Sequence, residues 1–147
     1  MSTTMERNEI IRNFAGSIHC SQIVVKQWAE ELGLDEETAV RMAAPFGGGC
    51  MGGDICGCVT GALMMIGAEY GHCEVGDTEG NARMVAKLTE FKQKFTEKCG
   101  SVICRDLIGY DFSKPEEREQ AFESGILFEK CPGYVNCALE ILDEIMK

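Results

Sequence analysis

The amino-acid sequence predicts one all-α, cysteine-rich domain over residues 1–147. We expect a compact bundle of six to eight helices around a buried central helix at about residues 55–70. Apolar residues recur at helical spacing from end to end, and no segment shows the alternation typical of a half-buried strand. Serine, aspartate, glycine and proline residues separate the periodic segments, as they do where helices start and stop.

Three helices are expected in the first third of the chain, at residues 5–15, 17–32 and 35–44. Gly33 follows the second, in the position where glycine commonly ends a helix. A loop comes next, because five of the eight residues from Phe46 to Gly53 are glycine. Such a loop can adopt positive φ angles and approach a ligand closely. It lacks the Lys-Ser/Thr pair of a phosphate-binding loop, so nucleotide binding is not expected.

The central helix is expected to be buried because it is apolar on nearly every side. Its Gly57 and Gly61 lie four residues apart and form a small-residue face for another helix or a cofactor. Further helices are expected at residues 78–98, at residues 101–108 and from residue 113 to about residue 125. The last helix is expected to open at Cys131-Pro132, since proline is favoured in a first helical turn.

Nine cysteines are the most informative feature of the sequence, and their odd number excludes a fully paired disulfide framework within one chain. No two cysteines have the Cys-x-x-Cys spacing, which disfavours zinc knuckles, ferredoxin-type runs and thioredoxin-like motifs. Four cysteines instead fall where helices are expected to begin. They are Cys20 after Ser17, Cys56 after Asp54, Cys104 after Ser101, and Cys131 as the cap itself.

A thiol at a helix start lies near free N–H groups and the positive end of the helix dipole, so it loses its proton readily. Thiolates are nucleophiles and ligands of soft metals. If Cys20, Cys56, Cys104 and Cys131 meet in the fold, they would line an electropositive pocket. Folding, not a local motif, would then assemble the site.

The other cysteines have weaker signals. Cys50 and Cys58, on either side of Cys56, are candidate auxiliary ligands or resolving thiols. His19, beside Cys20, is expected to face solvent. As an alternative, it could donate a hydrogen bond to a thiolate or act as a base. We expect Cys73, Cys99 and Cys137 to pack as small apolar side chains, which is a common role of free cysteine.

The net charge of −10 opposes binding to nucleic acid and to anionic membrane surfaces. Residues 1–13 are polar and charged and do not resemble a secretory leader. The longest apolar stretch, residues 55–68, is shorter than the roughly 20 residues that span a bilayer. We therefore expect a cytoplasmic protein that is not embedded in a membrane. Its thiols would be reduced and available for metal binding or redox chemistry.

Four segments carry a family resemblance that covers nearly the whole chain. They are His19-Cys20-Ser21-Gln22, Phe46-Gly-Gly-Gly with Cys56-Gly-Cys-Val-Thr-Gly61-Ala62, Ser101-Val-Ile-Cys104-Arg105 with Leu107-Ile-Gly109, and Cys131-Pro132 with Tyr134-Val135. In order and spacing they resemble the C-GCAxxG-C-C family of redox-active proteins. Cys58 replaces the usual alanine of that family, and Cys50 is additional. The resemblance implies redox chemistry at the four characteristic cysteines. A similar domain is associated with cytochrome-type proteins proposed to hold an iron–sulfur centre, and family members tend to be encoded near transporters.

The leading hypothesis is a redox protein in which Cys20, Cys56, Cys104 and Cys131 ligate an iron–sulfur cluster and exchange electrons with an unidentified partner. One alternative is a metal-free thiol–disulfide protein that uses Cys56 with Cys20 or Cys58. Another is a module that binds soft metal ions, such as zinc or copper(I), as a sensor or carrier for a transporter. The fourth hypothesis is a helical protein with a purely structural role. A homo-oligomer is compatible with each of them.

Overall fold

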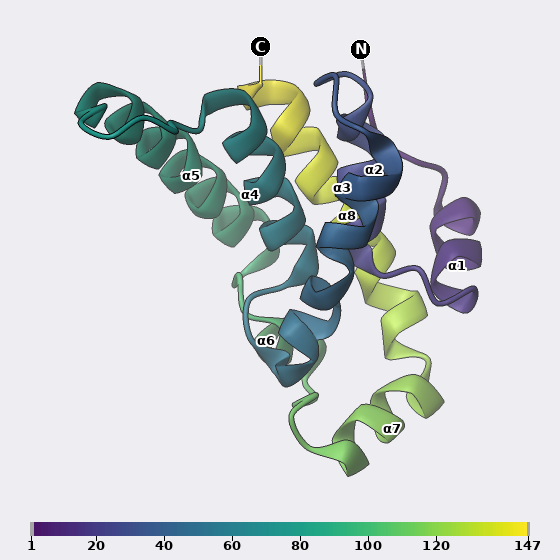
Figure 1. The fold of residues 1–147 in the computed structure, drawn as a ribbon. Helices are drawn as coiled ribbons and strands as arrows, with labels where there is room; N and C mark the ends of the chain where they lie inside the picture. Colours follow the sequence, from purple (N-terminus) through teal and green to yellow (C-terminus); the bar gives the residue numbers. More distant parts are fainter. Residues whose placement is uncertain (1, 147) are drawn as a thin grey trace.

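The computed structural model describes residues 2–146, and eight α-helices lie within them (Figure 1). In chain order they are α1 (Arg7–Ala15), α2 (Cys20–Ala29), α3 (Glu36–Ala43), α4 (Gly57–Tyr70), α5 (Thr78–Cys99), α6 (Cys104–Ile108), α7 (Pro115–Ser124) and α8 (Ile126–Ile145). Two short helical turns, η1 (Ala44–Phe46) and η2 (Gly49–Gly53), precede α4. The described residues form no strand, which confirms the all-α prediction. None of their helices is long and apolar enough to cross a membrane.

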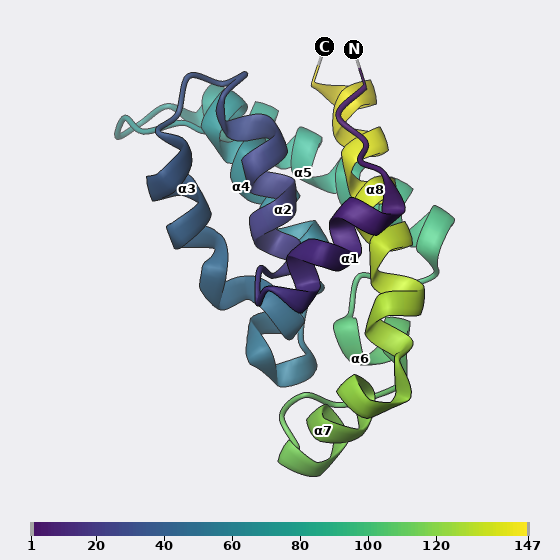
Figure 2. The ribbon, with the colours of Figure 1, turned by 90° about the vertical axis from the view of Figure 1, so that its right-hand side faces the viewer.

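Helix α4 is the buried central helix, and α2, α5 and α8 pack around it (Figures 1 and 2). Its Val59, Ala62 and Met65 are almost completely shielded from solvent, as expected of a helix that is apolar on nearly every side. The most extensive helix contact is with α2. A Cβ atom at Gly61 would lie only 2.8 Å from the carbonyl oxygen of Ser21, so glycine lets the two backbones meet. The small-residue face therefore receives a helix.

The last helix starts earlier than the sequence predicts, because α8 begins at Ile126 and contains Pro132 in its interior. Proline has no N–H group, so it cannot donate to the carbonyl of Phe128, four residues before it. Arg7 of α1 takes over this role: its Nη2 donates to the carbonyls of Phe128 at 3.0 Å and Glu129 at 2.8 Å. A long-range contact thus lets the helix continue through the proline. Cys131 consequently lies inside α8 and not at its start, which corrects the prediction.

The caps of three other helices differ from the prediction by two residues each. His19, Cys56 and Ile103 occupy the N-cap positions of α2, α4 and α6, where Ser17, Asp54 and Ser101 were expected. Ser17 has a φ of 70° and lies outside the helix, while the Ser101 hydroxyl accepts from the backbone N–H of Ile103 at 3.0 Å. Cys20, Cys56 and Cys104 nevertheless lie at or next to helix starts.

Candidate functional site

Five cysteines line one cavity of about 110 Å³. They come from separate parts of the chain: Cys20 from α2, Cys56 and Cys58 from the start of α4, Cys104 from α6, and Cys131 from α8. One water molecule needs only roughly 10–15 Å³, so this cavity has room for a larger group. The structure brings together all four cysteines that the sequence singles out and adds Cys58 as a fifth.

Cys56 and Cys104 are placed by a short antiparallel contact between two loops. Ile55 and Ile103 form an isolated β-bridge. Beside it, the backbone N–H of Cys56 donates to Val102 at 2.8 Å, and that of Cys104 donates to Asp54 at 2.6 Å. Both N–H groups are at helix starts, where no partner exists within the helix. The two helix starts are therefore fixed beside each other.

The glycine-rich loop adopts the left-handed backbone conformation that its composition predicts. Four consecutive residues have φ angles between 55° and 63°: Gly48, Gly49, Cys50 and Met51. A Cβ atom at Gly49 would lie 2.8 Å from the Cβ atom of Cys104, so only glycine permits this close approach to α6. Cys50 is exposed and does not line the cavity. The structure therefore brings only Cys58 of the two auxiliary candidates into the site.

Cys20 is the first residue of α2 and is surrounded by donors that favour its thiolate. Hydrogen bonds from the Cys56 and Cys58 thiols, and from the backbone N–H groups of Gly48 and Ser21, hold the pKa of Cys20 well below its ordinary value. Burial opposes this shift without reversing it. Donation to Cys20 in turn raises the pKa of Cys56 and of Cys58. Among these three thiols, Cys20 is therefore the one that loses its proton most readily.

The surroundings of Cys104 and Cys131 favour the neutral thiol, in contrast to those of Cys20. Burial raises the pKa of Cys104 to about 12, with a further contribution from the charge on Cys20. Burial also raises the pKa of Cys131, again aided by Cys20. Both effects disfavour a charged sulfur, because a thiolate needs solvation and is repelled by a neighbouring negative charge. Of the five cysteines that line the cavity, Cys20 is therefore the one whose thiolate its surroundings favour.

This difference in pKa predicts selective alkylation of Cys20. In protein freed of metal, iodoacetamide at about pH 6.5 should label Cys20 faster than a model-peptide thiol, whose pKa is about 8.5. Because the pKa of Cys20 is lowered, its thiolate should persist to a lower pH than that of an ordinary thiol. Timed labelling with peptide mass spectrometry measures each rate, and the Cys20→Ser chain should lose the fast phase. Labelling of Cys20 that rises only above about pH 8 would contradict the prediction.

His19, whose side chain was expected to face solvent, is half-buried, and both its ring and its backbone N–H make hydrogen bonds. Its Nδ1 lies 2.9 Å from the carbonyl oxygen of Ala44, and its backbone N–H donates to Oε1 of Gln22 at 2.9 Å. A carbonyl oxygen only accepts, so Nδ1 carries a proton. A Cβ atom at Gly47 would overlap the imidazole ring. His19 therefore ties the start of α2 to the η1 segment.

Tyr134 is a wall of the cavity that sequence reasoning did not assign to the site. Its hydroxyl donates to the carbonyl of Leu107 at 3.0 Å, and its ring packs against Phe95 with centroids 6.4 Å apart. Burial raises the pKa of Tyr134, and the nearby cysteines add to the shift, so the phenol stays a neutral donor. The sequence could have indicated this position, because Tyr134 follows Cys131 by three residues and residues at that spacing share a helix face.

The donor set suits a soft metal, although the thiols are not arranged around a common centre. Thiolates are the preferred ligands of iron–sulfur clusters and also bind zinc. Within residues 2–146, however, no three His, Cys, Asp or Glu side chains form a group positioned to hold a metal ion. Cys20 instead interacts with the thiols of Cys56 and Cys58. The site fits a cluster in donor chemistry, and ligation would require the sulfurs to turn toward one point.

A family model described as "Putative redox-active protein (C_GCAxxG_C_C)" matches residues 18–145 of the chain. The matched region contains all five cysteines of the cavity. No curated protein and no solved structure matches the chain. The family description agrees with a redox role and names no cofactor or reaction.

Proposed function

Since the chain belongs to the C_GCAxxG_C_C family of putative redox-active proteins, we propose that its redox centre is an iron–sulfur cluster. Cys20, Cys56, Cys104 and Cys131 would hold this cluster. The observation that carries the proposal is the position of these thiols, which come from four segments and line one cavity. Disulfide chemistry needs two cysteines, so the cavity contains more sulfur than that chemistry requires. The proposed activity is electron transfer to a partner protein.

The chain supplies three things that such a centre needs. Backbone N–H groups of Gly48 and Ser21 donate to the Cys20 sulfur, and donors of this kind tune cluster potentials. Apolar side chains restrict water around the sulfurs: Phe14, Ile18, Leu107, Ile108, Phe112 and Leu127. Several buried thiolates are costly unless a cation offsets their charge, which favours a metal-bound form. When bound, the cluster would take up and release single electrons.

Iron and acid-labile sulfide analysis of anaerobically purified, iron-replete protein tests the proposal. Iron and sulfide are expected in fixed proportion to the chain, with an electron paramagnetic resonance signal in the reduced or oxidised state. Protein that contains neither iron nor sulfide under these conditions would overturn the cluster. Zinc or copper(I) in their place would overturn it in favour of a soft-metal binding module.

A metal-free thiol–disulfide centre is the second candidate, favoured by the hydrogen bond from Cys56 to the Cys20 thiolate. The Cys20 thiolate would attack the disulfide of a substrate, forming a mixed disulfide and releasing one substrate thiolate. Cys56 would lose its proton to solvent and attack the Cys20 sulfur, which releases the second substrate thiolate. The chain would then hold a Cys20–Cys56 disulfide, and the substrate disulfide would be reduced.

Thiol counting and intact-mass measurement after oxidation test this second candidate. A reversible loss of two thiols, mapped to Cys20 and Cys56, is the expected result. The reaction would be abolished in Cys20→Ser protein and retained in Cys104→Ser protein, since Cys104 has no part in it. Failure to form a bond between Cys20 and either Cys56 or Cys58 would rule the candidate out.

A further inference from the structure

We propose that Cys99 and Cys137 form a second redox site, a dithiol that exchanges with low-molecular-weight disulfides. Their Sγ atoms lie 3.1 Å apart although 38 residues separate them in sequence. Both side chains are partly exposed, and neither lines the five-cysteine cavity. This site lies outside the cavity of the proposed cluster and goes beyond that proposal.

The two sulfurs are brought together by the packing of α5 against α8. Cys99 is the last residue of α5, where Gly100 ends the helix with a φ of 97°, and Cys137 lies within α8. Phe91 and Phe95 on the buried face of α5 are fully shielded from solvent. Both helix positions are therefore fixed by the core and by a terminating glycine, so the thiols are held in contact by the fold.

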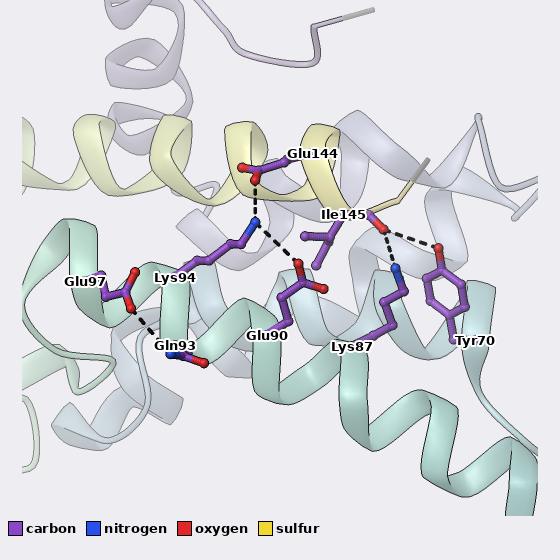
Figure 3. A network of polar contacts seen from close by, with 8 residues as sticks. All are labelled: Tyr70, Lys87, Glu90, Gln93, Lys94, Glu97, Glu144 and Ile145. Carbon is purple, nitrogen blue, oxygen red and sulfur yellow. Dashed lines mark hydrogen bonds and ion pairs between the residues drawn. The ribbon is translucent and has the colours of Figure 1, made fainter.

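Polar contacts farther along the same interface fix its direction and register (Figure 3). Nζ of Lys94 binds the carboxylates of Glu144 and Glu90, and Nζ of Lys87 donates to the carbonyl of Ile145 at 2.9 Å. Later positions on α5 thus meet earlier positions on α8, so the helices run antiparallel. The Cys99–Cys137 contact continues this order and is part of the helix interface.

The two thiols have different environments, which assigns a role to each. The Cys99 thiol donates to Sγ of Cys137. That hydrogen bond lowers the pKa of Cys137; burial and Glu140 oppose the shift and Lys98 assists it. The same bond raises the pKa of Cys99. Cys137 is consequently the attacking sulfur and Cys99 the resolving sulfur.

The reaction balances with a disulfide as the oxidant. The Cys137 thiol gives its proton to solvent and attacks one sulfur of the substrate, forming a mixed disulfide and releasing one substrate thiolate. Cys99 then gives its proton to solvent and attacks Sγ of Cys137, which releases the second thiolate. Two protein thiols are oxidised to one Cys99–Cys137 bond, and one substrate disulfide is reduced to two thiols.

Oxidised glutathione applied to the folded, reduced, full-length chain tests this site. After N-ethylmaleimide blocking, peptide mass spectrometry without reduction should find a Cys99–Cys137 bond that reduced glutathione reverses. Each of the two tryptic peptides holds a second cysteine, Cys104 with Cys99 and Cys131 with Cys137, so fragment-ion spectra are needed to identify which sulfurs are bonded. Free Cys99 and Cys137 thiols after prolonged exposure would overturn the proposal, as would a bond that forms only in urea.

Variants separate the two roles. Cys99→Ser protein should accumulate glutathione on Cys137, because no resolving thiol is present. Cys137→Ser protein should form neither this adduct nor the internal bond, whereas Cys73→Ser protein, which lacks an exposed cysteine, should behave as the parent. Equal adduct levels at Cys99 and Cys137 in the respective single variants would contradict the assigned order of attack. The iron content of Cys99→Ser and Cys137→Ser protein should equal that of the parent. Failure of this site can therefore be distinguished from failure of the cluster.

Discussion

Cys104→Ser protein is expected to lose the iron of the proposed cluster, and Cys131→Ser protein is expected to do the same. Each substitution removes one thiol from the cavity wall, and a serine hydroxyl is a poor ligand for a soft metal centre. The loss of affinity should exceed the roughly 10–100-fold that removal of an outer-shell partner costs. Iron and sulfide per chain after anaerobic purification, with the visible absorbance of the protein, measure the effect.

Cys50→Ser and Cys73→Ser are the matched controls for these variants, because both cysteines are exposed and lie outside the cavity. Their iron content should equal that of the parent. Full iron retention by Cys104→Ser or Cys131→Ser protein would remove that cysteine from the ligand set. Circular dichroism of each variant shows whether a loss of iron occurs in a folded chain. Retained disulfide exchange in Cys104→Ser protein, with no iron in the parent, would instead favour the Cys20–Cys56 dithiol.

Gly61→Ala is expected to destabilise the fold by about 1–3 kcal/mol, the usual cost of overpacking a core. The new Cβ atom would lie 2.8 Å from the carbonyl oxygen and 3.2 Å from the Cα atom of Ser21. These are backbone atoms of α2, and the Ser21 hydroxyl also donates to Ala43 at 2.7 Å, which limits the movement of that helix. The strain should therefore shift α2 and the Cys20 that begins it. Urea unfolding followed by circular dichroism measures the change in free energy.

Gly67→Ala in the same helix is the control. A Cβ atom there would meet no atom within 4 Å beyond the local helix backbone. Alanine is the better helix former by about 0.5–1 kcal/mol, so this variant should be as stable as the parent or slightly more stable. Equal destabilisation by the two substitutions would show that close packing of α2 on α4 is not what Gly61 provides.

Most helices can be predicted from the sequence, because the spacing of apolar residues within one segment is enough to indicate them. The apolar run of α4 and the amphipathic pattern of α5 depend only on residue spacing, and both helices lie within two residues of their predicted bounds. The start of α8 could not be predicted in this way. Pro132 normally marks a first turn, whereas in the fold Arg7 donates to the Phe128 and Glu129 carbonyls in the turn before it, and the helix begins earlier.

In the candidate site, too, some residues could be predicted from local sequence patterns and others could not. Helix starts drew attention to Cys20, Cys56 and Cys104 from local patterns, whereas Cys131 was selected through a helix start that the structure does not have. The hydrogen bond of Cys58 with Cys20 and the contact of Cys99 with Cys137 depend on helix packing over long sequence distances. No spacing rule within one segment predicts such pairs, so the structure was needed to find them.

X-ray absorption at the iron edge of anaerobically prepared parent protein tests most directly whether the cysteine cavity is the redox centre. Ligation by Cys20, Cys56, Cys104 and Cys131 predicts a first shell made only of sulfur, with iron neighbours in the second shell. The same spectrum should be absent or strongly altered in Cys131→Ser protein. Nitrogen or oxygen ligands around the iron, or protein without iron, would contradict the proposed centre.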